Sequence, residues 1–187
     1  MSNFTRAERK NANMQKELPV RKHPRLKAFN YSSDGAYFVT FCVKGKHEML
    51  GKIVGRGILD APLVQLSEYG KNIVGAIEFL NRKHDRMNIE KYVIMPNHVH
   101  FIVIVNDSGD GASGHNDDGA SGKPRPTNEL IPKLISSIKR FTNKKAGFDM
   151  WQTSYYDHII RNESDYQRIW QYIDENPARW EEDDYFV

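Results

Sequence analysis

The chain has 187 residues, a net charge of +3 and one cysteine, Cys42. This length predicts a single folded domain, and one cysteine excludes an internal disulfide and a cysteine zinc cage. No apolar run approaches the ~20 residues of a membrane span, and residues 1–16 lack the apolar core of a signal peptide. These features predict a soluble cytoplasmic protein without membrane contact, in which Cys42 is a buried thiol.

Positive charge is concentrated in an arm near the N-terminus and in a segment around residue 140. Together they supply six candidates for contact with a phosphate backbone: Arg21, Lys22, Arg25, Lys27, Lys139 and Arg140. Basic patches are the usual electrostatic footprint of nucleic-acid binding, but a solvated helix face or a flexible arm has the same composition. Residues 181–184 form an acidic tail instead.

The first half of the chain predicts two strands and one helix. Residues 1–20 are expected to be a flexible extension, and 37–43 an aromatic, β-branched strand. Residues 51–62 are punctuated by glycine and predict a loop, without the Gly-Lys-Ser/Thr pattern of a phosphate loop. Ser67 is placed to cap a helix with apolar residues at helical spacing, and a second strand follows at 89–95.

The most informative stretch begins at Met95-Pro96-Asn97, a tight break before an apolar strand at 98–105. His98 and His100 are two residues apart on this strand, so their side chains share one face. Both faces of the strand are apolar, as expected at the centre of a sheet. Paired imidazoles on a rigid strand suit a divalent metal. The alternative is two core histidines bonded to backbone carbonyls.

A polar insertion at 106–126 contains Asp-Gly-Ala-Ser-Gly twice. Such a segment buries too little apolar surface to order itself, so we expect a mobile loop. Thr127 is placed to cap the next helix, which Gly147 ends. Its apolar stripe is predicted to run from Ile131 to Phe141.

A fourth strand is predicted at 154–160, and a last helix begins at Asn162 and ends at 176–177. The order is strand, helix, strand, strand, helix, strand, helix. It predicts an α+β fold, the ferredoxin-like split βαβ arrangement with an antiparallel sheet and one extra C-terminal helix. We expect residues 21–187 to form this single domain.

The last helix carries a tyrosine and an amide away from its apolar stripe. At ~100° per residue, Tyr172 lies more than a quarter-turn from that stripe, and Asn176 follows one turn later on the same flank. A tyrosine there fits a surface residue, an interface anchor or a nucleophile. With a usual pKa of about 10, a phenol needs a nearby base or positive charge to attack at neutral pH.

The His98-Val99-His100 triplet resembles the HUH motif, and the segment Tyr172–Pro177 resembles the tyrosine motif of single-tyrosine HUH transposases. More closely, the chain resembles REP-associated tyrosine transposases and related bacterial transposase-like proteins, from about residue 20 to its end. Further matching segments are 35–40, 92–97, 151–162 and 165–166.

This resemblance implies a metal-dependent endonuclease and strand transferase that acts on single-stranded DNA. Tyr172 would attack a phosphodiester and form a 5′-phosphotyrosine, with the last helix carrying the nucleophile. His98, His100 and Asn176 would hold Mg²⁺ or Mn²⁺. Single-stranded or hairpin DNA would be the partner of a monomer or homodimer, with His158 and Arg161 joining the basic residues as candidate DNA contacts.

Other interpretations stay open. Histidine-triad nucleotide hydrolases also place His-x-His on a strand, but their pattern requires a histidine where this chain has Ile102. A ferredoxin-like nucleic-acid-binding protein without catalysis, or a domesticated hairpin binder, would stack bases on sheet aromatics such as Tyr37. The competing candidates for the nucleophile are Tyr155, Tyr156, Tyr166 and Tyr185.

Overall fold

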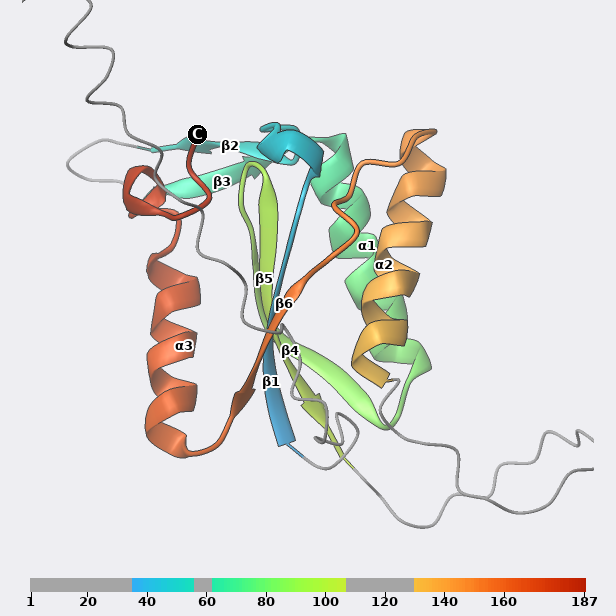
Figure 1. Ribbon diagram of the computed structural model, residues 1–187, viewed down its shortest axis with the longest axis vertical. Helices are drawn as coiled ribbons and strands as arrows, with labels where there is room; N and C mark the ends of the chain where they lie inside the picture. Colours follow the sequence, from blue (N-terminus) through green and yellow to red (C-terminus); the bar gives the residue numbers. More distant parts are fainter. Residues whose placement is uncertain (1–34, 56–61, 107–129) are drawn as a thin grey trace, which may run out of the picture.

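The computed structural model describes residues 35–55, 62–106 and 130–187. Its main sheet has the strand order β4-β5-β1-β6. The strands are β1 (Gly35–Cys42), β4 (Met87–Ile94), β5 (His98–Val105) and β6 (Tyr156–Ile160). The helices α1 (Glu68–Lys83) and α2 (Leu130–Ala146) lie on one side of the sheet, and α3 (Glu163–Glu175) lies on the other (Figure 1).

All three neighbouring strand pairs of the main sheet are antiparallel. The strands β1 and β4, joined through α1, are therefore parallel to each other with β5 between them. In the same way β5 and β6, joined through α2, have β1 between them. This is the split βαβ arrangement, so the predicted fold class and order of elements are confirmed.

The prediction of a loop at 51–62 is wrong at its start. The strands β2 (Gly51–Val54) and β3 (Leu63–Leu66) pair antiparallel as a separate two-stranded sheet. A Cβ atom on Gly51 would lie 2.7 Å from the carbonyl oxygen of Gln65. Glycine is therefore required by the close approach of the two strands, although in the sequence it suggested a break.

Side chains of β1 and β5 alternate between two apolar layers. The layer under α1 and α2 includes these residues of the two strands: Tyr37, Val39, Phe41, Val99, Phe101, Val103 and Val105. The layer under α3 is smaller and includes Phe38, Ile102, Ile160, Ile169 and Ile173. Because His98 and His100 have the same parity as Ile102, they face α3. Cys42 is buried, as predicted.

The helix ends follow the predicted signals. The Ser67 hydroxyl accepts a hydrogen bond from the backbone N–H of Gly70 at 3.3 Å, and the Asn162 side chain accepts one from the N–H of Asp165 at 2.9 Å. Gly147 follows α2 with a φ of +82°, the left-handed conformation that commonly ends a helix.

The apolar stripe of α2 differs from the prediction at its end. Phe141 is exposed, so its assignment to the core is wrong, and Thr142 is buried instead. Around the helix, Thr142 lies about 40° from the buried Ile138 and Phe141 about 60° to the other side. The Thr142 hydroxyl accepts a hydrogen bond from Trp151 Nε1 at 2.7 Å, which makes its burial favourable.

Several predictions fall outside the described residues: the 1–20 extension, the basic arm at 21–27, Thr127, and the 106–126 insertion after Asn106. Within the described part of the chain, no helix has the length and apolar character required to cross a membrane.

Candidate active site

The predicted histidine pair lies at the start of the central strand β5. His98 is 0% exposed and His100 1% exposed, and their Nε2 atoms are 2.8 Å apart. The strand register sets this arrangement, because residues two apart on β5 point to the same side of the sheet. The site therefore lies between the sheet and the C-terminal part of the chain.

Asn97 determines which nitrogen of His98 carries the proton. The Asn97 amide N–H₂ donates to the carbonyl oxygens of Lys46 at 3.1 Å and Tyr185 at 2.9 Å. The Asn97 Oδ1 atom must then accept from Nδ1–H of His98, 2.9 Å away. The lone pair of His98 is consequently on Nε2, which faces the site.

His100 is held from the neighbouring strand β1. The Thr40 Oγ1 atom lies 2.6 Å from Nδ1 of His100. A hydroxyl both donates and accepts, so Thr40 can bond either tautomer of His100. For both histidines Nδ1 bonds a side chain, and the two Nε2 atoms converge. A pair of core histidines bonded to backbone carbonyls would not have this arrangement.

Both imidazoles are neutral at physiological pH. Burial, with a contribution from the positive charge of Lys46, lowers the pKa of His98 to about 3. Burial and the neighbouring His98 lower the pKa of His100 well below its usual value, although Asp183 opposes this shift. Neutral imidazoles have the free lone pairs that metal coordination requires.

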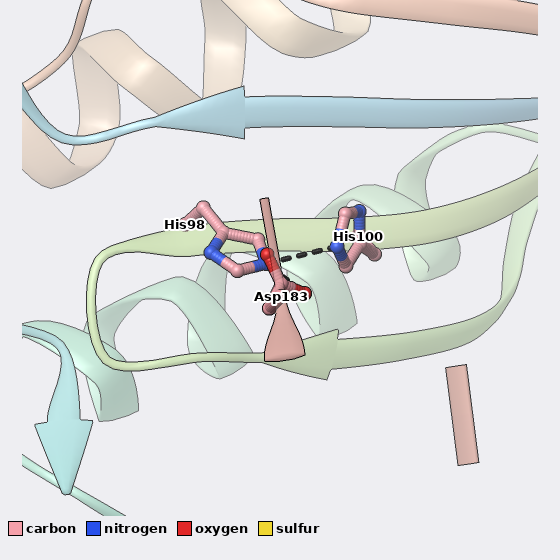
Figure 2. A group of neighbouring side chains, drawn as sticks. All are labelled: His98, His100 and Asp183. Atoms are coloured by element: carbon pink, nitrogen blue, oxygen red, sulfur yellow. Dashed lines mark hydrogen bonds and ion pairs between the residues drawn. The ribbon is translucent and has the colours of Figure 1, made fainter. Parts of the chain in front are cut away.

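Asp183 completes a cluster that the sequence analysis missed. One carboxylate oxygen of Asp183 and the Nε2 atoms of His98 and His100 all lie within 4.8 Å of one another (Figure 2). The side chain is 2% exposed, and its other oxygen accepts from the N–H of Tyr185 at 2.7 Å. The residues at 181–184 are therefore not a uniform acidic tail.

A buried tryptophan anchors the segment that carries Asp183. Trp180 begins the short helix η2 (Trp180–Glu182), is 5% exposed, and its ring lies 5.9 Å from that of His98. The ring of Tyr185 lies 4.5 Å from His98 on the other side of Asp183 in the chain. The aromatic residues flanking the acidic run were the sequence signal that this segment folds back onto the domain.

Asn176, the predicted third ligand, contacts the cluster through Asp183. Its amide N–H₂ donates to Oδ2 of Asp183 at 2.8 Å. The side-chain oxygen of Asn176 is buried and has no hydrogen-bond partner among the residues that the structure describes. A buried amide oxygen without a partner is costly in free energy and keeps its lone pairs available to a cation.

Tyr172 lies beside this cluster, on the helix flank that the sequence predicted. Its hydroxyl is 3.2 Å from Nε2 of His100 and 3.4 Å from Oδ2 of Asp183. Burial of the hydroxyl end and the negative charge of Asp183 raise the pKa of Tyr172 above its usual value. The residue as a whole is 41% exposed, so solvent and substrate can reach it.

Among the competing tyrosines, Tyr185 shares the site with Tyr172, since its ring lies 4.5 Å from that of His98, whereas Tyr155, Tyr156 and Tyr166 have other surroundings. The Tyr166 hydroxyl donates to Glu90 at 2.7 Å, and burial together with Glu90 raises its pKa to about 12. Tyr155 packs partly buried against the larger core, and Tyr156 is exposed. Tyr172 differs from these residues in that its hydroxyl lies 3.2 Å from Nε2 of His100.

The predicted DNA contacts are divided between the two faces of the sheet. His158 on β6 lies on the α3 face, bonded to Asp165 at 2.7 Å, and Arg161 is exposed just after β6. Arg140 is exposed on α2, across the sheet from the histidines. The Lys139 ammonium donates to the carbonyl of Gln152 at 2.7 Å and to those of two following residues, and burial lowers its pKa to about 8.

An open cleft of about 750 Å³ adjoins the histidine pair. It is lined by residues of β1, β5, β6, α3 and the C-terminal segment, including His100, Tyr172 and His158. The nucleophile candidate Tyr172 and one predicted DNA contact, His158, therefore line the same open cleft.

Comparison with known proteins gives a fold and a relative. No family model matches the chain. An uncharacterized protein of Haemophilus influenzae is 30% identical over 174 residues, which cover 89% of this chain and 93% of the relative. The structure of a REP-associated tyrosine transposase bound to a REP hairpin superposes with a TM-score of 0.56 at 20% identity, covering 83% of this chain and 74% of that one. A structure from Deinococcus radiodurans gives a TM-score of 0.43 at 14% identity, too low to establish a shared fold. The chain therefore belongs to one family with the Haemophilus influenzae protein, and it has the fold of a REP-associated tyrosine transposase, as the sequence resemblance predicted.

Proposed function

We propose that this protein is a metal-dependent endonuclease and strand transferase for single-stranded DNA, with Tyr172 as the nucleophile. The observation that carries the proposal is the hydroxyl of the partly exposed Tyr172, which lies 3.2 Å from Nε2 of His100 in a buried pair of neutral histidines. The solved transposase with this fold was bound to a hairpin of DNA, which supports DNA as the substrate.

The donor atoms beside Tyr172 fit a divalent cation. They are two imidazole nitrogens, from His98 and His100, and one carboxylate oxygen, from Asp183. Since burial keeps both imidazoles neutral, their lone pairs can act together with a carboxylate oxygen of Asp183 as ligands of one cation. The mixed nitrogen and oxygen set fits Mn²⁺ or Mg²⁺, with Asn176 adding a further oxygen close by.

When bound, such a cation polarises the phosphate under attack and favours the phenolate form of the tyrosine. The chain's own residues orient the reaction. The Tyr172 oxygen forms a bond to phosphorus while the bond from phosphorus to the 3′ oxygen breaks. The phenolic proton is lost, the departing 3′ oxygen takes up a proton, and DNA stays joined to the protein as a 5′-phosphotyrosine.

The reverse step explains strand transfer. A 3′ hydroxyl that attacks the phosphotyrosine restores a phosphodiester and releases Tyr172. One phosphate ester bond is exchanged for another at each step, so joining requires no separate energy source. Water competes with the 3′ hydroxyl for attack on the phosphotyrosine. Because the histidine side of the site is buried, water can reach Tyr172 only through the open cleft.

Trapping of the covalent adduct tests this function. End-labelled single-stranded DNA is incubated with the protein and Mn²⁺, the products are separated on a denaturing gel, and the modified peptide is mapped by mass spectrometry. Tyr172→Phe removes one oxygen atom and should abolish the adduct. Tyr166→Phe, which loses a hydroxyl from the same helix, is the matched control and should retain it. An adduct that persists in Tyr172→Phe would disprove the assignment.

The alternative of a nucleic-acid-binding protein without catalysis named Tyr37 as a sheet aromatic on which bases would stack. Tyr37 is fully buried and faces α1 and α2, so the expectation that it stacks bases is wrong. The histidine-triad alternative is also weakened, because Ile102 is part of the apolar layer under α3. Binding of DNA without any adduct, in the presence of metal, would favour a binding protein over an enzyme.

A further inference from the structure

The helix α3 packs against β4 and β5, at one side of the sheet face that it covers. The open cleft lies toward the other side, where β1 and β6 form its floor with Phe38, Thr40, Tyr156 and His158. The wall opposite this floor includes Tyr172. Because β6 is the edge strand, the cleft opens at the border of the sheet.

The strand register aligns Tyr156 with the histidine pair. His100 on β5 is opposite Thr40 on β1, and Thr40 is opposite Tyr156 on β6. Residues directly opposite in an antiparallel sheet point to the same face. Tyr156 thus stands two strands from His100, at about 10 Å if neighbouring strands are ~4.8 Å apart.

We propose that Tyr156 is a stacking platform for an unpaired base of the DNA strand that Tyr172 attacks. The proposal rests on the proposed function only in taking single-stranded DNA as the ligand. Tyr156 is 46% exposed on the strand β6, and exposed sheet aromatics are surfaces on which single-stranded nucleic acids stack. A tyrosine loses little rotamer freedom on binding, so stacking orders few new torsions.

The charges of the cleft favour stacking over phosphate attraction as the source of binding at this point. Arg179 is paired with Glu175 at 2.9 Å, and Asp165 contacts both His158 and Arg168. Both arginines named here already have a carboxylate partner. The contribution of Tyr156 should therefore be nearly independent of salt, whereas a phosphate contact releases counterions and is strongly salt-dependent.

The test measures binding in the full-length Tyr172→Phe protein with a chelator present, so that neither cleavage nor metal contributes. Two fluorescent probes carry the same number of phosphates: a thymidine homopolymer and an abasic homopolymer. Tyr156→Leu should weaken binding of the thymidine probe about tenfold and leave the abasic probe unchanged. The loss should be the same at low and high salt. Tyr156→Phe keeps the ring and should restore binding.

Phe79→Leu is the matched control. Phe79 is 50% exposed on α1, on the other side of the sheet, and its loss should change neither probe. Equal losses in Tyr156→Leu and Phe79→Leu, or an equal loss for both probes, would overturn the proposal. So would failure of Tyr156→Phe to restore binding while circular dichroism shows a folded protein. An absent covalent adduct in the wild type would instead count against the proposed function alone, because this test does not use cleavage.

Discussion

The two faces of the main sheet are built for different purposes. The face under α1 and α2 packs a large apolar cluster against both helices, with Phe101 at 0% exposure near its centre. The face under α3 has a smaller apolar cluster, next to which lie buried polar side chains: Thr40, His98, His100 and Asn176. Burial of polar groups costs stability unless each is bonded, so the second face gives up packing in order to position donor atoms.

The largest effects should come from alanine substitutions of β5 residues that face opposite sides of the sheet. His98→Ala with His100→Ala should abolish metal-dependent adduct formation while the protein still folds, because these side chains belong to the small layer. Phe101→Ala, next to His100 in sequence but facing α1 and α2, should cost about 3–5 kcal/mol of unfolding free energy. Chemical denaturation and the adduct assay measure the two quantities. Full activity in the double histidine variant would end the metal assignment.

The pH dependence of stability should also arise from the α3 face. Burial lowers the pKa of His98 from 6.5 to about 3 and lowers that of His100 in the same direction. The unfolded chain therefore binds more protons below pH 6.5, and stability must fall as the pH drops from about 6.5 toward 3. In metal-free protein, the variant His98→Gln with His100→Gln should show a flatter decline over this window. Parallel curves for variant and wild type would contradict the burial of two neutral imidazoles.

A comparison of Asp183 with its neighbour Asp184 tests whether Asp183 is a metal ligand or only part of an acidic segment. Asp183→Asn should reduce Mn²⁺ affinity by more than the ~10–100-fold that loss of an outer hydrogen-bond partner usually costs. Asp184→Asn changes the same charge one residue later, outside the donor cluster, and should leave the affinity unchanged. Titration calorimetry measures both. If the two variants lose affinity equally, the effect is general electrostatics and Asp183 is not a ligand.

Local periodicity explains what the sequence could predict. The alternation of β5 placed His98 and His100 on one face, and helical spacing placed Tyr172 off the apolar stripe of α3. Both predictions need only the geometry of a single element. Because Tyr155 and Tyr156 are neighbours in the strand predicted at 154–160, alternation places one inward and the other outward, and the structure has Tyr155 packed on the core and Tyr156 exposed.

The residues that were missed depend on contacts between distant segments. Asp183 reaches the histidines only because the chain turns back after α3 and Trp180 is buried against the domain. Lys139 was predicted to be a cation available for DNA on a helix. In the structure its ammonium group donates to three carbonyl oxygens of residues 152–154, the segment that precedes β6. Strands as short as β2 and β3 carry too few residues for a pattern of alternation to be read.

The smallest and most selective effect should come from two buried threonines, one on each face. The hydroxyl of Thr142, on α2, accepts a hydrogen bond from the indole N–H of Trp151. Thr142→Val leaves that donor without a partner, so it should cost about 1–3 kcal/mol of stability without changing Mn²⁺ affinity. Thr40 bonds Nδ1 of His100 on the α3 face. Thr40→Val removes this bond while keeping the side-chain shape, and it should weaken Mn²⁺ binding about tenfold by freeing the imidazole to rotate. Denaturation and calorimetry on both variants give a two-by-two comparison. If Thr40→Val lowers stability and leaves metal affinity unchanged, the hydroxyl is part of the packing, and the histidine pair is oriented by its strand alone.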